Sequence, residues 1–156
     1  TIPQIDTSMV GSMIYMFGHC SNLTTIPQID TSSLGNIAYM FYNCTNLTTI
    51  PQLNGEKIGT LSSTFNGCKS LENFNGLINL GQAYQTSQSA NYNNYKLSLI
   101  SSNKLTHDSL MNVINNLYDI KTKGVKPQQL VLGSTNLAKL TAEEVAIATN
   151  KGWTVS

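Results

Sequence analysis

Charged side chains are scarce in this chain. Of its 156 residues only 11% are charged, and the formal net charge is +1, whereas about a quarter of an average globular chain is charged. The sequence therefore lacks the basic patch by which proteins bind nucleic acid or an anionic membrane surface. It also lacks an apolar run of about 18 residues, which predicts that this segment does not insert into a membrane. Serine, threonine and asparagine replace the missing charges and predict a neutral surface of hydroxyl and amide groups.

Cysteine is also rare, and its number is odd. Three cysteines cannot form a complete disulfide framework. Cys20, Cys44 and Cys68 are 24 residues apart, which favours small buried side chains in stacked units. One disulfide between neighbouring units stays open as an alternative, because stacked strands lie about 5 Å apart. The absence of a Cys-x-x-Cys pair argues against a zinc site.

The motifs of common enzymes are missing. The chain has no Gly-x-Ser-x-Gly, no phosphate-binding glycine loop and no His-Glu-x-x-His. His19 adjoins Cys20, but neighbouring residues of a coil point in different directions, so the two are not expected to act as a nucleophilic pair. His107 is expected to be a solvated residue in the first turn of a helix. The sequence thus predicts no catalytic residue, no cofactor and no enzyme, with a hydrolase of unrecognised site as the alternative.

Aspartate recurs once per unit in the first two units. Asp6 and Asp30 would stack about 5 Å apart, and such a pair with backbone oxygens can hold calcium. Asn54 takes this position in the third unit, and the Asp-Thr-Ser context is typical of capping and turns. Capping is therefore the favoured role, and no metal site is predicted.

A 24-residue unit fills the first half of the chain. Residues 1–24 and 25–48 are identical at 16 of 24 positions, and residues 49–72 share 8 of 24 with the second unit. Common to all three are Ile-Pro-Gln, a glycine and the frame Phe-x-x-Cys-x-x-Leu. A fixed period of this length indicates a solenoid of stacked coils. Because the chain opens inside this frame without an initiator methionine, we expect further repeats or a targeting segment upstream.

Each unit is predicted to hold a strand and a short helix. Residues 23–29 are an extended run rich in Thr and Ile, which suits a strand, and Pro27 interrupts its ladder because proline has no N–H. Asp30 begins a turn. The apolar positions that follow are three or four residues apart, which favours a short helical or 3₁₀ segment with one buried face: Leu34, Ile37, Ala38, Phe41 and Cys44.

The period is lost after Phe74. Residues 81–95 are rich in Gln, Ser, Asn and Tyr and are predicted to be an irregular loop or insertion. Residues 96–156 read as strand, helix, strand, helix and strand, with Thr106 and Thr141 as helix caps, which favours parallel strands with right-handed crossovers. The predicted fold is α/β. It is a right-handed leucine-rich-repeat solenoid over 1–80, with parallel strands and short helices in the repeats, continued by a C-terminal cap with longer helices over 96–156.

The repeat frame resembles a known family. Phe-x-x-Cys-x-x-Leu with Ile-Pro and Asp-Thr-Ser is similar to the BspA-like bacterial surface leucine-rich repeats, and the signature residues are Phe17, Cys20 and Leu23, Phe41, Cys44 and Leu47, and Phe65, Cys68 and Leu71. The segment from Leu105 to Trp153 resembles the C-terminal segment that accompanies these repeats in gut bacteria and their phages. The resemblance implies an extracellular or cell-surface adhesin that binds a host or bacterial protein or glycan, and it implies no catalytic residue.

Polar rows on the strand side are the candidate binding face. Thr25, Gln28, Thr49 and Gln52 would place hydroxyls and amides in rows that meet a partner, although for any one residue simple solubility is the favoured explanation. Tyrosines in the irregular loop are candidate contacts too: Tyr84, Tyr92 and Tyr95. The predicted function is a non-enzymatic binding or adhesion module, and the alternative is a structural or receptor-binding component of a phage tail or similar assembly.

Overall fold

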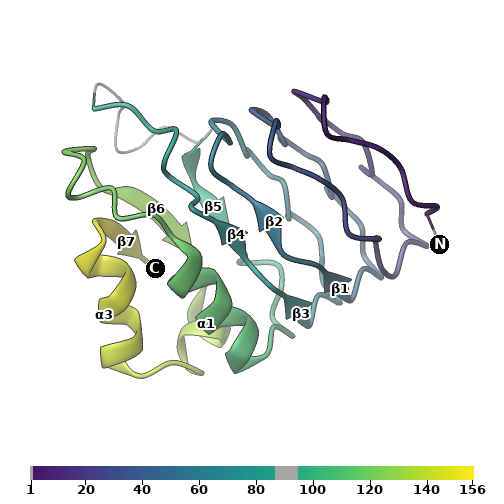
Figure 1. Cartoon of the computed structure of the whole chain (residues 1–156). Coiled ribbons are helices and arrows are strands. Elements are labelled where there is room, and N and C mark those ends of the chain that lie inside the picture. The colour runs from purple at the N-terminus through teal and green to yellow at the C-terminus, as the bar shows by residue number, and fades with distance from the viewer. Residues whose placement is uncertain (1, 87–94) are drawn as a thin grey trace.

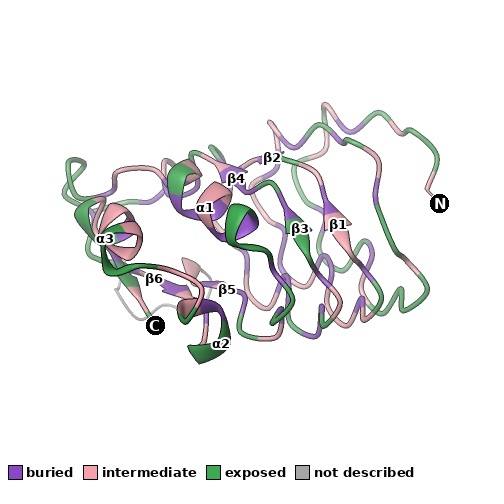
Figure 2. Cartoon of the chain, turned by 90° about the horizontal axis from the view of Figure 1, so that it is seen from below, coloured by how far each residue is buried: buried purple, intermediate pink, exposed green. Residues whose placement is uncertain are grey.

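The structure is a computed structural model that describes residues 2–86 and 95–156. The 24-residue units lie side by side in a row, and the C-terminal part with its helices covers one end of that row (Figure 1). The first unit lies at the opposite end. Buried residues are concentrated from the second unit to the C-terminal part, whereas most of the first unit is exposed or partly buried (Figure 2).

Neighbouring units pair in parallel. β1 (Thr49–Ile50) pairs with β3 (Asn73–Phe74), and β2 (Leu53–Asn54) pairs with β4 (Leu77–Ile78). In both pairs a residue faces the one that follows it by 24 positions. Equal units stacked in this register place the same backbone groups opposite each other, so one pattern of hydrogen bonds repeats along the row. The right-handed leucine-rich-repeat solenoid stays a prediction.

The second half of each repeat is a series of turns, so the predicted short helices are wrong. Along residues 37–44 alternate N–H groups donate to the carbonyl three residues back, as from Met40 to Ile37 at 3.1 Å. The N–H groups between them donate to the next unit, as from Tyr39 to the Ser62 carbonyl at 2.9 Å. An α-helix needs every N–H for its own ladder. Bonding between units takes half of these donors, which excludes a helix.

The apolar positions of the frame form the core. Phe41, Cys44 and Leu47 are fully buried, and the same three positions of the third unit are 0–1% exposed. The phenylalanine rings form a column, in which Phe41 lies 5.5 Å from Phe17 and 5.9 Å from Phe65 between ring centroids. In the first unit Cys20 is exposed. The prediction that these positions face inward is confirmed for the second and third units.

The C-terminal part contains a three-stranded parallel sheet in the order β5-β6-β7. This confirms the predicted parallel strand-helix pattern. The elements are β5 (Leu97–Ser98), α1 (His107–Asn116), β6 (Gln128–Val131), α2 (Ser134–Leu137), α3 (Ala142–Asn150) and β7 (Trp153–Val155). Thr106 caps α1 by accepting from the N–H of Ser109, and Thr141 with Glu144 forms the predicted capping box of α3.

Side-chain hydrogen bonds join this part to the last repeat. The Ser109 hydroxyl donates to the Glu72 carbonyl at 2.9 Å and accepts from the N–H of Phe74 at 3.0 Å. The Ser102 hydroxyl donates to the Cys68 carbonyl at 3.1 Å. Both serines are buried, so the end of the row is closed by groups that satisfy its backbone.

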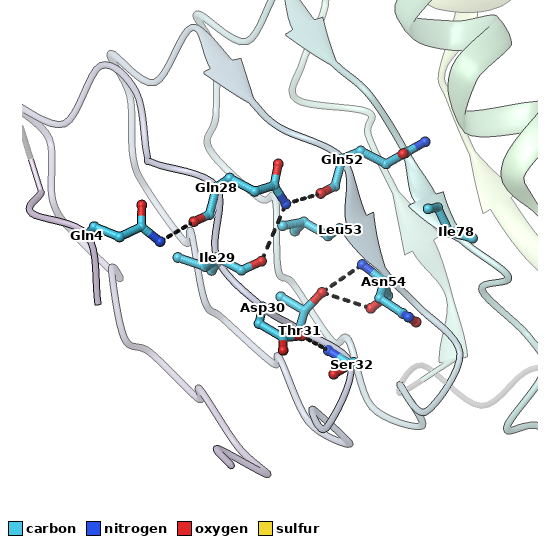
Figure 3. Close-up of a pocket in the computed structure, with 10 residues that line it drawn as sticks. All are labelled: Gln4, Gln28, Ile29, Asp30, Thr31, Ser32, Gln52, Leu53, Asn54 and Ile78. Atoms are coloured by element: carbon cyan, nitrogen blue, oxygen red, sulfur yellow. Dashed lines mark hydrogen bonds between the residues drawn. The ribbon is translucent and has the colours of Figure 1, made fainter. Parts of the chain in front are cut away.

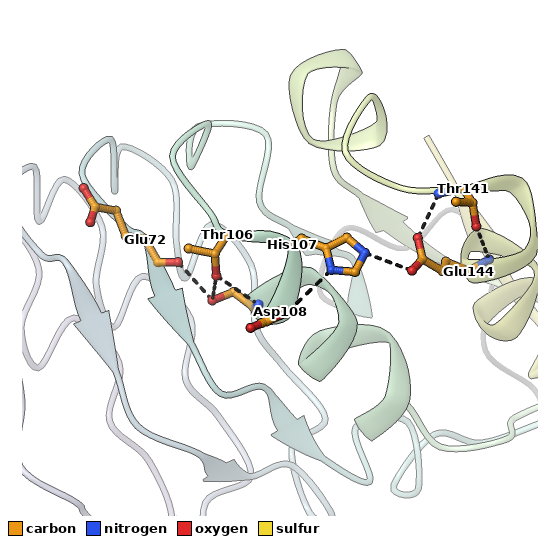
Figure 4. Close-up of polar contacts among 7 residues, drawn as sticks. Glu72, Thr106, His107, Asp108, Thr141 and Glu144 are labelled. Atoms are coloured by element: carbon orange, nitrogen blue, oxygen red, sulfur yellow. Dashed lines mark hydrogen bonds and ion pairs between the residues drawn. The ribbon is translucent and has the colours of Figure 1, made fainter.

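An ion pair links the first turns of α1 and α3 (Figure 4). The His107 Nε2 lies 2.9 Å from Glu144 Oε1, while Glu144 Oε2 accepts from the N–H of Thr141 at 2.8 Å. The side-chain hydrogen bond to Glu144 raises the pKa of His107, and the hydrogen bond from the Thr141 backbone lowers the pKa of Glu144. The prediction that His107 is a solvated residue of the first helical turn was therefore incomplete. Its partner Glu144 lies 37 residues away, and the sequence around His107 does not indicate it.

We predict that this pair makes stability depend on pH. A histidine with a raised folded pKa stabilises the protein fully below its unfolded pKa, near 6.5, and loses that contribution as pH rises through the folded value. The urea midpoint should therefore fall between pH 5.5 and pH 8, and His107→Gln should reduce this fall. His19→Gln is the control. The His19 ring packs against the Tyr42 ring, so this variant removes a histidine and leaves the pair of His107 and Glu144 intact. An unchanged pH profile in His107→Gln contradicts the prediction.

Candidate functional site

A shallow groove of about 500 Å³ lies on the strand side of the repeats (Figure 3). We call it the strand-side groove. It crosses three successive units and reaches β4, so it is a product of stacking and not of any single unit. Its lining residues are Gln4, Gln28, Ile29, Asp30, Thr31, Ser32, Gln52, Leu53, Asn54 and Ile78.

Glutamine side chains form a ladder along one wall of the groove (Figure 3). The Gln4 amide donates to the Gln28 carbonyl at 2.8 Å, and the Gln28 amide donates to the Gln52 carbonyl at the same distance. The Gln52 amide continues to the Asn75 carbonyl at 3.5 Å. Each exposed glutamine is thus tied to the backbone of the next unit.

Proline removes a backbone donor from the ladder beside the glutamines. The N–H of Asn75 donates to the Ile50 carbonyl at 3.3 Å, but Pro51, one period earlier, has no N–H to donate. The Gly76 carbonyl accepts the backbone N–H of Leu53 at 3.1 Å. The Gln52 carbonyl, one period earlier, accepts the side-chain amide of Gln28. The glutamine after each proline therefore adds a bond between units close to the position where the ladder lacks a backbone donor.

The other wall of the groove consists of turns with their own side-chain caps. Asp30 Oδ1 accepts the N–H of Ser32 at 2.8 Å, and hydrogen bonds from Ser32 lower the pKa of Asp30. The Thr31 hydroxyl donates to the Asn54 carbonyl at 3.1 Å. These bonds confirm the capping role predicted for Asp30 and keep its carboxylate charged at the groove.

The groove contains two of the four residues predicted for the binding face. Gln28 and Gln52 are exposed and line it. Thr25 and Thr49 lie outside the lining and face each other in an isolated parallel bridge. Gln28 and Gln52 thus lie in the groove, and their part in binding stays a prediction. The sequence did not single out Thr31, whose position between two units depends on the stacking register.

The two described tyrosines of the predicted loop, Tyr84 and Tyr95, are not exposed. Tyr84 is fully buried, and its hydroxyl donates to the Tyr95 carbonyl at 3.0 Å. Burial raises the pKa of this phenol. The prediction that Tyr84 contacts a partner is therefore wrong, because its ring packs against Tyr95 and Trp153 inside the protein. Tyr95 is partly buried, and Tyr92 lies outside the described residues.

The cysteines are free thiols. Cys44 donates to the Phe17 carbonyl at 2.9 Å, and Cys68 donates to the Phe41 carbonyl at 3.2 Å. Burial raises the pKa of Cys44 to about 11 and that of Cys68 to about 12, so both stay protonated and unreactive at neutral pH. They are structural groups in the core, as the sequence predicts.

Within 2–86 and 95–156, no group of three or more His, Cys, Asp or Glu side chains is arranged to hold a metal ion. In the same part of the chain, no helix has the length and apolar character needed to cross a membrane.

The fold and the groove define a repeat protein whose stacked units present a polar face. A family model described as Mycoplasma protein of unknown function, DUF285, matches residues 1–80, and the chain belongs to this family. The match covers the repeats and not the C-terminal sheet and helices. No curated protein matches the chain. No solved structure matches it either.

Proposed function

We propose that this chain is a non-enzymatic binding module, located outside the cell or on its surface, that recognises a protein or glycan partner through the strand-side groove. The glutamine ladder carries this proposal. Its amide donors are held by carbonyls of the next unit, so the side chains are already ordered before a partner arrives. A preformed face loses little conformational entropy on binding.

The ladder leaves acceptor groups for a partner. Gln28 donates to both the Gln52 and the Ile29 carbonyls, which uses its two amide hydrogens and leaves its side-chain oxygen as an acceptor. Asp30 adds a carboxylate in the same groove. This arrangement suits a partner rich in N–H or hydroxyl donors, which both polypeptides and glycans supply.

We also propose that the repeats form a right-handed leucine-rich-repeat solenoid of the BspA-like class. The parallel register of 24 residues, the buried Phe-x-x-Cys-x-x-Leu frame and the membership of residues 1–80 in the DUF285 family support it. A location at the bacterial cell surface is part of the same proposal.

A binding array with a paired variant tests the groove. The purified chain is applied to immobilised glycans and extracellular matrix proteins, and the double variant Gln28→Ala, Gln52→Ala is applied in parallel. We expect the variant to lose at least tenfold in affinity for the captured partner, about 1.4 kcal/mol. Loss of the ladder bonds should also lower the free energy of unfolding by about 1 kcal/mol each, which leaves the protein folded.

Gln85→Ala with Lys104→Ala is the matched control, because both residues are exposed outside the groove. This control should bind as the unchanged protein does. Circular dichroism verifies that all variants are folded. A silent array, or full binding by the glutamine variant, refutes the proposed site.

A further inference from the structure

A column of tyrosine rings on the turn side of the repeats is interrupted at the third unit. Tyr15 and Tyr39 are one period apart, and their rings stack with centroids 4.6 Å apart and planes 3° from parallel. Both have left-handed backbones with φ of 58°, and Ser63, the next position of the column, has φ of 54°. The backbone of the third unit therefore repeats the geometry, but the ring is absent.

A hollow of about 310 Å³ lies where the third ring would stand. Tyr39 forms its aromatic wall, and its polar wall includes Ser63, Asn66, Lys96, Ser98 and Ser101. This volume lies at the lower end of the range of small-molecule pockets, about 300–1,000 Å³. We call this space the Tyr39 hollow, and it shares no lining residue with the strand-side groove.

Contacts within the protein hold Tyr39, Asn66 and Ser101 in the walls of the hollow. The N–H of Tyr39 donates to the Ser62 carbonyl at 2.9 Å, which holds the tyrosine against the third unit. Tyr15 covers one face of the Tyr39 ring, so the opposite face is turned towards Ser63. The Ser101 hydroxyl donates to Asn66 Oδ1 at 3.2 Å and thereby connects the third unit to the segment after β5.

The chemistry of the walls fits a sugar ring. A pyranose has an apolar face of C–H groups, which meet the negative face of an aromatic ring, and an edge of hydroxyls, which hydrogen-bond to serine and asparagine. We propose that the Tyr39 hollow binds one pyranose ring of a glycan, stacked on Tyr39 in the place of the missing third tyrosine. This site goes beyond the strand-side groove and does not depend on it.

Other ring-shaped ligands fit the walls less well. A nucleotide needs cations for its phosphates, but the sequence contains no arginine and Lys96 is the one cation among the lining residues. A tyrosine or tryptophan of a protein partner brings a single polar group, whereas the hollow is lined by four serines, an asparagine and a lysine. A ligand with hydroxyls around its edge satisfies more of these groups.

Saturation-transfer NMR on the whole chain tests the proposal. The probes are the methyl glycosides of glucose, galactose, mannose and N-acetylglucosamine, with AMP and N-acetyltyrosinamide as representatives of the other classes. We expect saturation transfer to the ring C–H protons of at least one glycoside. Absence of transfer to all four glycosides, or transfer to AMP or N-acetyltyrosinamide alone, overturns the proposal.

The variant Ser63→Tyr is the decisive one. It completes the column and fills the hollow, and its backbone already has the conformation that tyrosine adopts at 15 and 39. We expect it to stay folded and to weaken glycoside binding at least tenfold, while Ser63→Ala keeps the hollow open and retains binding. Gln28→Ala with Gln52→Ala should also retain it, so failure at one site is distinguished from failure at the other. Undiminished binding by Ser63→Tyr overturns the proposal.

Discussion

Replacement of Phe41 by alanine is expected to lower the free energy of unfolding by about 3–5 kcal/mol. Phe41 is fully buried in the middle of the phenylalanine column, with Phe17 on one side and Phe65 on the other. Its removal loses the transfer free energy of the ring and leaves a cavity between two units that cannot collapse, because the backbone bonds between units fix their spacing. Urea denaturation followed by circular dichroism measures the loss.

Phe17→Ala is the matched control for this position. Phe17 has a ring neighbour in the column on one side only and is 6% exposed. Its replacement should therefore destabilise the protein clearly less than Phe41→Ala does, since fewer contacts are lost and the site opens to water. A loss at Phe17 equal to or larger than that at Phe41 contradicts the stacking of units as the main source of stability.

The sequence predicted the features that repeat. Identical apolar positions at a period of 24 residues are buried because each unit covers the next, so Phe41, Cys44 and Leu47 face inward in the structure. Helix caps were also predictable, because Thr106 and Thr141 act on N–H groups only three residues away. Helix caps and strictly periodic core positions can therefore both be predicted from a single sequence.

The turns at residues 37–44 were not predictable from spacing. Steps of three and four residues suit a helix and a row of turns equally, because both place such residues on one face. The choice depends on whether the N–H groups bond within the unit or between units, and the neighbouring unit decides this by presenting carbonyls at Ser62 and Thr64. A single repeat read alone contains no such information.

Only part of the candidate site could be predicted from the sequence, because the site also depends on contacts between neighbouring units. Gln28 stood out as a repeated polar residue, but its bond to the Gln52 carbonyl depends on the register in which neighbouring units stack. Tyr84 lies in a polar segment without an apolar pattern, yet it is buried because the C-terminal strand brings Trp153 against it. The hollow beside Tyr39 likewise depends on which ring is missing one unit later.

The second large effect is expected at Trp153, the single tryptophan of the chain. Trp153 is 1% exposed in β7, its indole N–H donates to the Tyr118 carbonyl at 3.0 Å, and its ring lies 6.0 Å from that of Tyr84. It therefore joins the last strand to the end of the repeats and to the segment after α1. Trp153→Ala should lower the free energy of unfolding by about 3–5 kcal/mol, as measured by circular dichroism in urea.

Two further variants separate the parts played by the indole. Trp153→Phe keeps an aromatic ring but leaves the Tyr118 carbonyl without its indole donor, which costs about 1–3 kcal/mol and should be less than the alanine variant loses. Thr154→Ala, at the exposed neighbouring position of β7, removes only the hydrogen bond from its hydroxyl to the Gln128 carbonyl at 3.1 Å and should cost about 1 kcal/mol or less. A loss below about 1 kcal/mol in Trp153→Ala would show that the C-terminal sheet is held by its strands alone and that the repeats do not need it. The expected larger loss means that the end of the row and its cap unfold together, with Trp153 as the contact between them.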